Sequence, residues 1–167
     1  MANVFQLSSP YPMPTGLGCN RRDACRLLEV YCGQASELTL VTQVAFHQTE
    51  AMQNNASIAQ TLQGICRVDL QHLTMLGSCI RQLGARPTYR TCPNGEPVPW
   101  TPRFVNYRSS MRDMLEADIR TKERIVRRYN RLIHCIGNTQ ISALLNRICE
   151  DELLHISLLT ELLNCYF

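Results

Sequence analysis

Residues 141–166 have the sequence ISALLNRICEDELLHISLLTELLNCY, and one helical face of this stretch is apolar except at its centre. Steps of four and three residues alternate along that face, the spacing of a helix that packs against partners in a bundle. The face comprises Ile141, Leu145, Ile148, Glu152, His155, Leu159, Leu162 and Tyr166. A buried carboxylate and a buried imidazole each need a partner, a proton or a metal ion. The sequence therefore predicts a polar site at mid-helix.

Three further stretches predict helices of similar design, at about residues 20–52, 56–84 and 110–137. Asn20, Ser110 and Asn138 or Thr139 are suited to cap helix N-termini, and Gly84 and Gly137 to end helices. Each predicted buried face is interrupted at its middle by polar residues: Glu37 in the first helix, Asp69 and His72 in the second, and Asp118 and Lys122 in the third. Since every such insertion costs core stability, we expect the four helices to share one central site.

Two stretches rich in proline are expected to be non-helical. Residues 1–20 form an irregular arm, and residues 85–108 form a linker. The linker is long enough to run the length of a helix, at roughly 3.3 Å per residue, so the second and third helices should be parallel. We therefore predict one all-α domain over residues 21–167, a four-helix bundle of two antiparallel pairs joined by a crossover.

Charge and cysteine content limit the classes of protein. The formal net charge is +3, and Lys122 is the only lysine among 17 basic residues. The nine cysteines include no C-x-x-C pair, so we expect reduced and mostly buried thiols and no zinc or rubredoxin-type knuckle. No apolar run approaches the length of a membrane span, and no signal peptide is recognisable. These features predict a cytoplasmic protein without a membrane partner.

Several short motifs resemble the rubrerythrin and bacterioferritin branch of the ferritin-like superfamily, over roughly residues 24–164. The motifs are Ser36-Glu37-Leu38-Thr39, Asp69-Leu-Gln-His72, Leu83-Gly84-Ala-Arg-Pro87, Phe104-Val-Asn-Tyr107 and Asp151-Glu152-Leu-Leu-His155. The resemblance implies a ferritin-like bundle with a carboxylate and histidine site for iron or manganese. It also implies redox chemistry with oxygen or peroxide, for which this chain would need an external electron donor.

The resemblance assigns roles to individual residues. The metal ligands it implies are Glu37, Asp69, His72, Glu152 and His155, with Asp118 and Tyr129 beside them. Two positions differ from the family pattern, because Asp69 stands in place of a glutamate and Lys122 in place of a metal-bridging glutamate. Glu37, Asp69 and Glu152 with a protonated Lys122 carry a charge of −2, which suits at most one divalent ion.

Alternatives remain beside this interpretation. An ammonium can replace a metal charge, so a metal-free structural or interaction protein with Lys122 at its centre is the second hypothesis. The sequence assigns no catalytic residue.

Two histidines, His47 and His134, lie off the predicted buried faces and are expected at the surface. Four arginines line the outer face of the third helix (Arg120, Arg124, Arg127 and Arg131), where we favour a solvated face paired with carboxylates over nucleic-acid or phosphate binding. A homodimer is the expected assembly.

Overall fold

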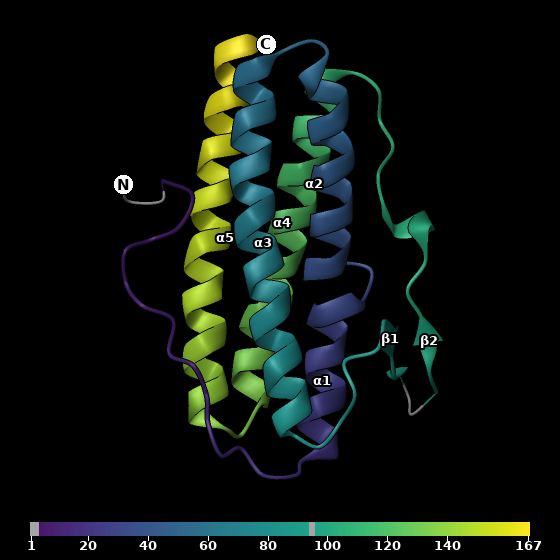
Figure 1. Ribbon diagram of the computed structural model, residues 1–167, viewed down its shortest axis with the longest axis vertical. Coiled ribbons are helices and arrows are strands. Elements are labelled where there is room, and N and C mark those ends of the chain that lie inside the picture. Colours follow the sequence, from purple (N-terminus) through teal and green to yellow (C-terminus); the bar gives the residue numbers. More distant parts are fainter. Residues whose placement is uncertain (1–3, 94–95) are drawn as a thin grey trace.

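The computed structural model describes residues 4–93 and 96–167, and its long helices lie side by side in a bundle (Figure 1). The helices are α1 (Arg21–Cys32), α2 (Glu37–Met52), α3 (Ala56–Gln82), α4 (Met111–Cys135) and α5 (Thr139–Tyr166). α1 and α2 follow one another along one side of the bundle, and together they form its first column. α3 and α4 run in the same direction, and α2 and α5 run in the opposite one. The predicted all-α four-helix bundle with a long crossover is confirmed.

The predicted helix starts are correct because they depend on local capping chemistry. The side chains of Asn20, Ser110 and Asn138 accept hydrogen bonds from backbone amides three residues later, and Asn55 does the same at the start of α3. Gly84 has a φ of 84°, the left-handed conformation that glycine adopts readily after a helix. These caps set where α3, α4 and α5 begin, and so at which height each helix presents its polar residues.

The prediction of one continuous helix over residues 20–52 is wrong, because the chain leaves the helical conformation between Gly33 and Ser36. The Gly33 amide still donates to Glu29 O at 3.1 Å, and Gly33 then continues in an extended conformation. Ser36 restarts the helix, since its hydroxyl caps the amide of Thr39. Glu37 is consequently the first residue of α2 rather than a mid-helix residue.

The crossover contains structure that the proline-rich sequence did not reveal. Strands β1 (Arg90–Thr91) and β2 (Val98–Pro99) pair antiparallel, and a short 3-10 helix spans Pro102–Phe104. The indole of Trp100 donates to Thr39 Oγ1 at 3.0 Å, which attaches the crossover to α2. From the hairpin the chain returns along the bundle to the start of α4 (Figure 1).

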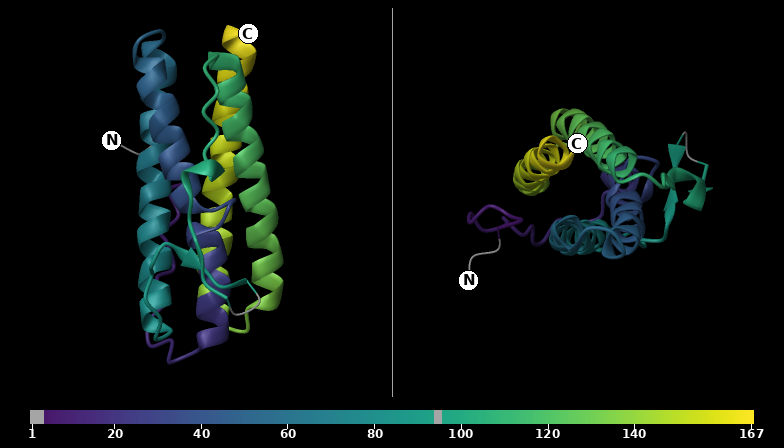
Figure 2. Two further views of the ribbon diagram at one scale, coloured as in Figure 1. Left: turned by 90° about the vertical axis from the view of Figure 1, so that its right-hand side faces the viewer. Right: turned by 90° about the horizontal axis from the view of Figure 1, so that it is seen from above.

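The N-terminal arm covers the space between α3 and α5 (Figure 2). Near α1 it is attached at two points: Gln82 donates to Pro14 O at 2.9 Å, and the Thr15 amide donates to Gln140 Oε1 at 3.0 Å. Farther from α1, the ring of Phe5 lies against Gly64 of α3. A Cβ atom at Gly64 would stand 2.2 Å from that ring, so α3 can accept Phe5 only because residue 64 is glycine.

Two apolar clusters fill the bundle, one on each side of the polar centre. One contains Val44, Ile58, Leu62, Leu115 and Leu159, and the other contains Leu27, Leu76, Ile80, Leu145 and Ile148 with their neighbours. No helix in the described part of the chain is both long and apolar enough to cross a membrane.

The cysteines are less buried than expected. All nine are unpaired, but only Cys32, Cys79 and Cys149 are buried, whereas Cys19, Cys135 and Cys165 are exposed. The exposed thiols lie just before α1 and near the C-terminal ends of α4 and α5, and Cys25, Cys66 and Cys92 are half-buried.

Candidate metal centre

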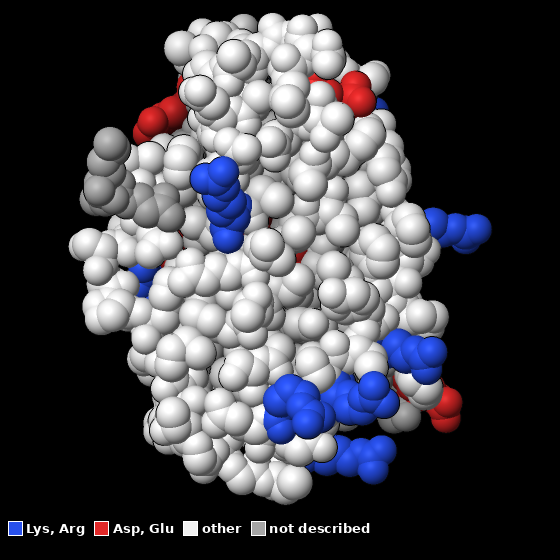
Figure 3. Space-filling view, viewed as in Figure 1, with Lys and Arg blue, Asp and Glu red and all other residues white. Residues whose placement is uncertain are grey.

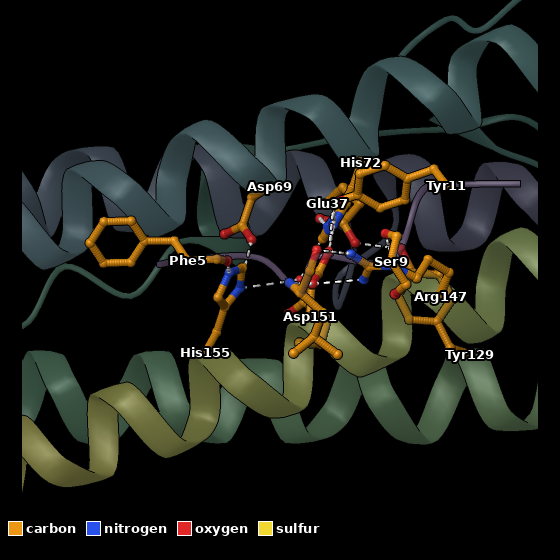
Figure 4. A network of polar contacts seen from close by, with 12 residues as sticks. Phe5, Ser9, Tyr11, Glu37, Asp69, His72, Tyr129, Arg147, Asp151 and His155 are labelled. Carbon is orange, nitrogen blue, oxygen red and sulfur yellow. Dashed lines mark hydrogen bonds and ion pairs between the residues drawn. The ribbon is translucent and has the colours of Figure 1, made fainter. Parts of the chain in front are cut away.

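The six residues expected at the centre come together from four helices, and every one of them is fully buried. They are Glu37 of α2, Asp69 and His72 of α3, Lys122 of α4, and Glu152 and His155 of α5. Figure 4 shows several of these side chains pointing toward one another between the helices. The arrangement divides into two halves with different hydrogen bonding, named here the lysine half and the open half.

In the lysine half, the ammonium of Lys122 is fully hydrogen-bonded. Nζ lies 2.9 and 3.0 Å from the two oxygens of Asp69, 3.0 Å from Glu152 Oε2 and 3.1 Å from His155 Nδ1. An ammonium has three donors, so these three side chains use all of them. Burial lowers the pKa of Lys122, but Asp69, Glu152 and Glu37 outweigh it and raise the pKa above the ordinary value. A positive charge therefore occupies this half.

In the open half, three ligand-type atoms face one another without a hydrogen-bond partner among the described residues: Glu37 Oε2, His72 Nδ1 and Glu152 Oε1. His72 Nδ1 lies 3.3 Å from Glu152 Oε1 and 3.8 Å from Glu37 Oε2. Buried polar atoms without partners are costly. Ligand atoms of Glu37, Asp69, His72 and Glu152 all lie within 4.8 Å of one another, so this group could hold a metal ion. The donors present fit one divalent cation, because the other half already holds a charge.

The carboxylate shared by both halves is Glu152, which differs from the expectation that Lys122 occupies a bridging position. Glu152 Oε1 faces His72, and Glu152 Oε2 accepts from Lys122. The Lys122 ammonium contacts Asp69 and His155, both in the lysine half. Lys122 therefore occupies a position within that half and does not bridge the two halves. Burial raises the pKa of Glu152, but Lys122 and both histidines outweigh it and hold the pKa well below the usual range.

Glu37 has a different electrostatic environment from Glu152. Burial and the neighbouring charge of Glu152 raise the pKa of Glu37 to about 7. Tyr129 donates a short hydrogen bond to Glu37 Oε1, as expected for a residue beside the site. Burial and the Glu37 charge raise the pKa of Tyr129 well above its ordinary value, so the phenol remains a donor. Glu37 can thus release a proton near neutral pH when a cation arrives.

Both histidines turn Nδ1 toward the centre and use Nε2 for outer contacts. His155 Nε2 lies 2.8 Å from Phe5 O, to which it donates, and His72 Nε2 lies 3.3 Å from both Asp151 Oδ2 and Tyr11 Oη. Outer hydrogen bonds of this kind fix the ring orientation and tautomer of metal-binding histidines. Burial lowers the pKa of His72, but Asp151, Glu152 and Glu37 outweigh it and raise the pKa well above the ordinary value. A cation at Nδ1 would replace this proton.

Asp151 is a site residue that the ligand assignment missed. It accepts from the Leu7 amide at 2.8 Å and from Tyr11 Oη at 2.6 Å, and its Oδ1 lies 2.7 Å from Arg147 Nη1. Arg147 in turn donates to Ser9 O and Leu7 O of the arm. Asp151 is part of the Asp-Glu-x-x-His motif, but its role comes from contacts with the arm. Those contacts join residues about 140 positions apart in the sequence, so helical spacing does not reveal them.

Asp118 and His47 do not lie where the sequence predicted. His47 is fully buried, and its Nδ1 lies 2.9 Å from both oxygens of Asp118. His47 Nε2 lies 2.8 Å from Asn106 O of the crossover, and Gln43 donates to Asp118 at 2.7 Å. Asp118 thus belongs to a separate polar cluster that holds the crossover, because α2 buries a second face there. His134 is exposed, as predicted.

Comparison with known proteins identifies the fold. No family model and no curated protein matches the sequence. The structure is similar to that of KatB, a manganese catalase from Anabaena, with a TM-score of 0.81 and 20% identity over 95% of this chain and 80% of that chain. It is also similar to the bacterioferritin of Desulfovibrio desulfuricans, a protein with a diiron site, with a TM-score of 0.67 and 18% identity over 87% of this chain and 84% of that chain.

A mycobacterial bacterioferritin is similar too, with a TM-score of 0.68 and 23% identity over 88% of this chain and 86% of that chain. The similarity covers the complete bundle in each case, while the sequence identity is low. The chain therefore has the ferritin-like four-helix-bundle fold.

Proposed function

We propose that the protein is a ferritin-like metal-binding protein that holds a single divalent iron or manganese ion in the open half of the centre. Glu37, His72 and Glu152 would be its ligands, and Lys122 would take the place of a second ion. The neighbours with this fold include a manganese catalase and a protein with a diiron site, which supports the choice of these two metals.

The observation that carries the proposal is a set of three buried ligand atoms that make no hydrogen bond within the described part of the chain, Glu37 Oε2, His72 Nδ1 and Glu152 Oε1. Only ion-pair contacts of 3.3 and 3.8 Å, both through His72 Nδ1, join these atoms. The three atoms come from three different helices, so the residue spacing along a single helix does not account for their proximity. Carboxylate oxygens and an imidazole nitrogen suit both iron and manganese. A cation bound there would be coordinated by all three atoms and would replace the ion-pair contacts of His72.

When bound, such an ion can exchange electrons with oxygen or peroxide, and we propose redox chemistry of this class with an external electron donor. The chain's own residues would orient the ligands and control protons. Tyr129 donates a hydrogen bond to one oxygen of Glu37, Asp151 contacts Nε2 of His72, and Phe5 O accepts a hydrogen bond from Nε2 of His155. The arm excludes water, since all six central residues are fully buried.

A second candidate function is that of a metal-free structural or interaction protein. The observation that favours it is the complete hydrogen bonding of Lys122 by Asp69, Glu152 and His155. With His72 protonated as well, the cluster would hold two positive charges without any metal.

Metal analysis separates the two candidates. Purified protein is loaded without oxygen with ferrous iron or manganese(II), then freed of loosely bound ions, and the ratio of metal to protein is measured. We expect one ion per chain in the wild type and none in Glu37→Gln, with one ion retained by the control Glu116→Gln, which changes a half-buried carboxylate of α4 that lies outside the centre and pairs with Arg112 and Arg120. No retained metal in the wild type would favour the metal-free function.

A further inference from the structure

A second feature of the molecule lies outside the metal centre, where α4 passes the junction of α1 and α2. Two adjoining hollows occur there, of about 380 and 190 Å³. Both are lined by Arg128 and Arg131 of α4. The larger also has Arg26, Glu29, Val30, Leu132 and Cys135 in its wall, and the smaller has Gln34 and Ala35 at the break in the first column.

The arginines of the smaller hollow are poorly neutralised. It is lined by Arg124, Arg127, Arg128 and Arg131. Arg128 lies 3.4 Å from Glu29, and Arg127 reaches Glu123 only at 4.0 Å. In residues 4–93 and 96–167, Arg124 and Arg131 have no carboxylate within ion-pair distance. The solvated face paired with carboxylates, which the sequence favoured for this stripe, is therefore present only in part.

Nearer its N-terminus, α4 carries arginines that are paired with a carboxylate. There Arg112 and Arg120 both pair with Glu116, at 3.1 and 3.2 Å. Excess positive charge is thus concentrated at the hollows and does not extend along all of α4. Figure 3, viewed from the side of Figure 1, shows several basic side chains near the lower end of the molecule and others higher up and at its edges.

We propose that these two hollows form a binding site for a small phosphate-bearing anion, with the phosphates held by Arg124, Arg127 and Arg131. Guanidinium groups bind phosphate oxygens in pairs of parallel hydrogen bonds, and the larger hollow has a volume typical of small-molecule sites. A nucleic acid would need an extended basic face, whereas the arginines of the adjoining turns of α4, Arg112 and Arg120, are both paired with Glu116. The ligand is either a free phosphate chain or a nucleotide whose base occupies the larger hollow.

The test is calorimetric titration of the wild-type protein with tripolyphosphate, followed by ATP, at moderate salt. We expect saturable binding of one tripolyphosphate per chain. The double variant Arg124→Gln/Arg131→Gln should weaken binding about tenfold or more, because it removes two charge-assisted contacts. The matched control is Arg112→Gln/Arg120→Gln, which removes the same charge from the same helix and should change binding less than twofold.

ATP binding more tightly than tripolyphosphate would identify a nucleotide site, and equal binding would identify a site for the phosphate chain alone; both support the proposal. Three results would overturn it: no saturable binding to the wild type, equal weakening in the two double variants, or binding of a short DNA duplex in preference to tripolyphosphate. Circular dichroism of each variant checks that the bundle is folded, which we expect because the substituted side chains are exposed.

Discussion

At the scale of single residues, Lys122 sets the charge of the centre. Its ammonium is fully buried and contacts Asp69, Glu152 and His155, so it stabilises two carboxylates that would otherwise repel each other. Removing one partner of a buried ion pair is much more damaging than removing an exposed pair, since the remaining charge stays desolvated.

Lys122→Met is therefore expected to lower the free energy of unfolding by about 3–5 kcal/mol without metal at neutral pH. Methionine fills much of the space but leaves Asp69 and Glu152 without a cation. Urea denaturation measures the change. Arg112→Met, which breaks an exposed pair with Glu116, should cost less than about 1 kcal/mol and serves as the control. Equal effects in the two variants would mean that Lys122 is not the counterion of the centre.

Asp151 makes the stability depend on pH. Burial raises the pKa of Asp151, but His72, Tyr11, the Leu7 amide and Arg147 outweigh it and hold the pKa below the usual range. A carboxyl group with a lowered folded-state pKa stabilises the fold above its unfolded pKa, near 4, and this contribution is lost as the pH falls further.

Asp151→Asn should accordingly reduce the free energy of unfolding by about 3 kcal/mol at neutral pH, since Arg147 loses its buried partner. The difference between variant and wild type should shrink as the pH falls from about 6 to about 3. Denaturation at several pH values provides the measurement. A difference that stays constant over this range would show that the ionised form of Asp151 contributes nothing.

At the scale of elements, the N-terminal arm supplies the outer contacts of both histidines through Phe5 O and Tyr11 Oη. It also covers the centre between α3 and α5 (Figure 2). The fit of the arm depends on Gly64, because the Phe5 ring occupies the space that a Cβ atom would need.

Gly64→Ala should displace the arm while leaving α3 intact, since alanine favours helix by roughly 1 kcal/mol over glycine. We expect faster hydrogen exchange of the Leu7 amide, which donates to Asp151, and faster metal uptake. The control is Gly77→Ala, because a Cβ atom there meets its nearest neighbour at 3.5 Å, an ordinary contact. Unchanged exchange at Leu7 in Gly64→Ala would contradict the role of this glycine.

Tyr11→Phe tests the outer contact without removing the arm. The phenylalanine ring can keep its place under Arg147, but the hydroxyl bonds to Asp151 and His72 are lost. Loss of such an outer partner should weaken metal binding by about tenfold or more. Competition with a chelator measures the affinity. An unchanged affinity would show that Asp151 orients His72 without help from the arm.

Sequence analysis was accurate where local chemistry determines structure and failed where contacts are distant. Helix starts at Asn20, Ser110 and Asn138 follow from capping, and helical spacing brought Glu37, Asp69, His72, Lys122, Glu152 and His155 to one height. The break at Gly33 was missed because apolar residues at helical spacing lie on both sides of it, Leu27 and Val30 before it and Val41 and Val44 after it. The burial of His47 and the part played by Asp151 depend on the crossover and the arm, and spacing along one helix carries no information on either.

At the scale of the whole molecule, two apolar clusters enclose a polar layer, and that layer is asymmetric. One half is hydrogen-bonded by the Lys122 ammonium, and the other contains three ligand atoms that make no hydrogen bond among the described residues and are joined only by ion-pair contacts. This asymmetry is the basis for proposing one metal ion in a fold whose neighbours include a protein with a diiron site.

The most direct test of this account is the number of metal ions bound by Lys122→Glu. The substitution replaces a cation with a fourth carboxylate, changing the charge of the four residues from −2 to −4, which two divalent ions neutralise. Asp69→Glu can be added to lengthen the neighbouring carboxylate. Metal-to-protein ratios are measured after loading with ferrous iron without oxygen. The account predicts one ion per chain in the wild type and up to two in the variant; two ions in the wild type, or none in the variant, would contradict it.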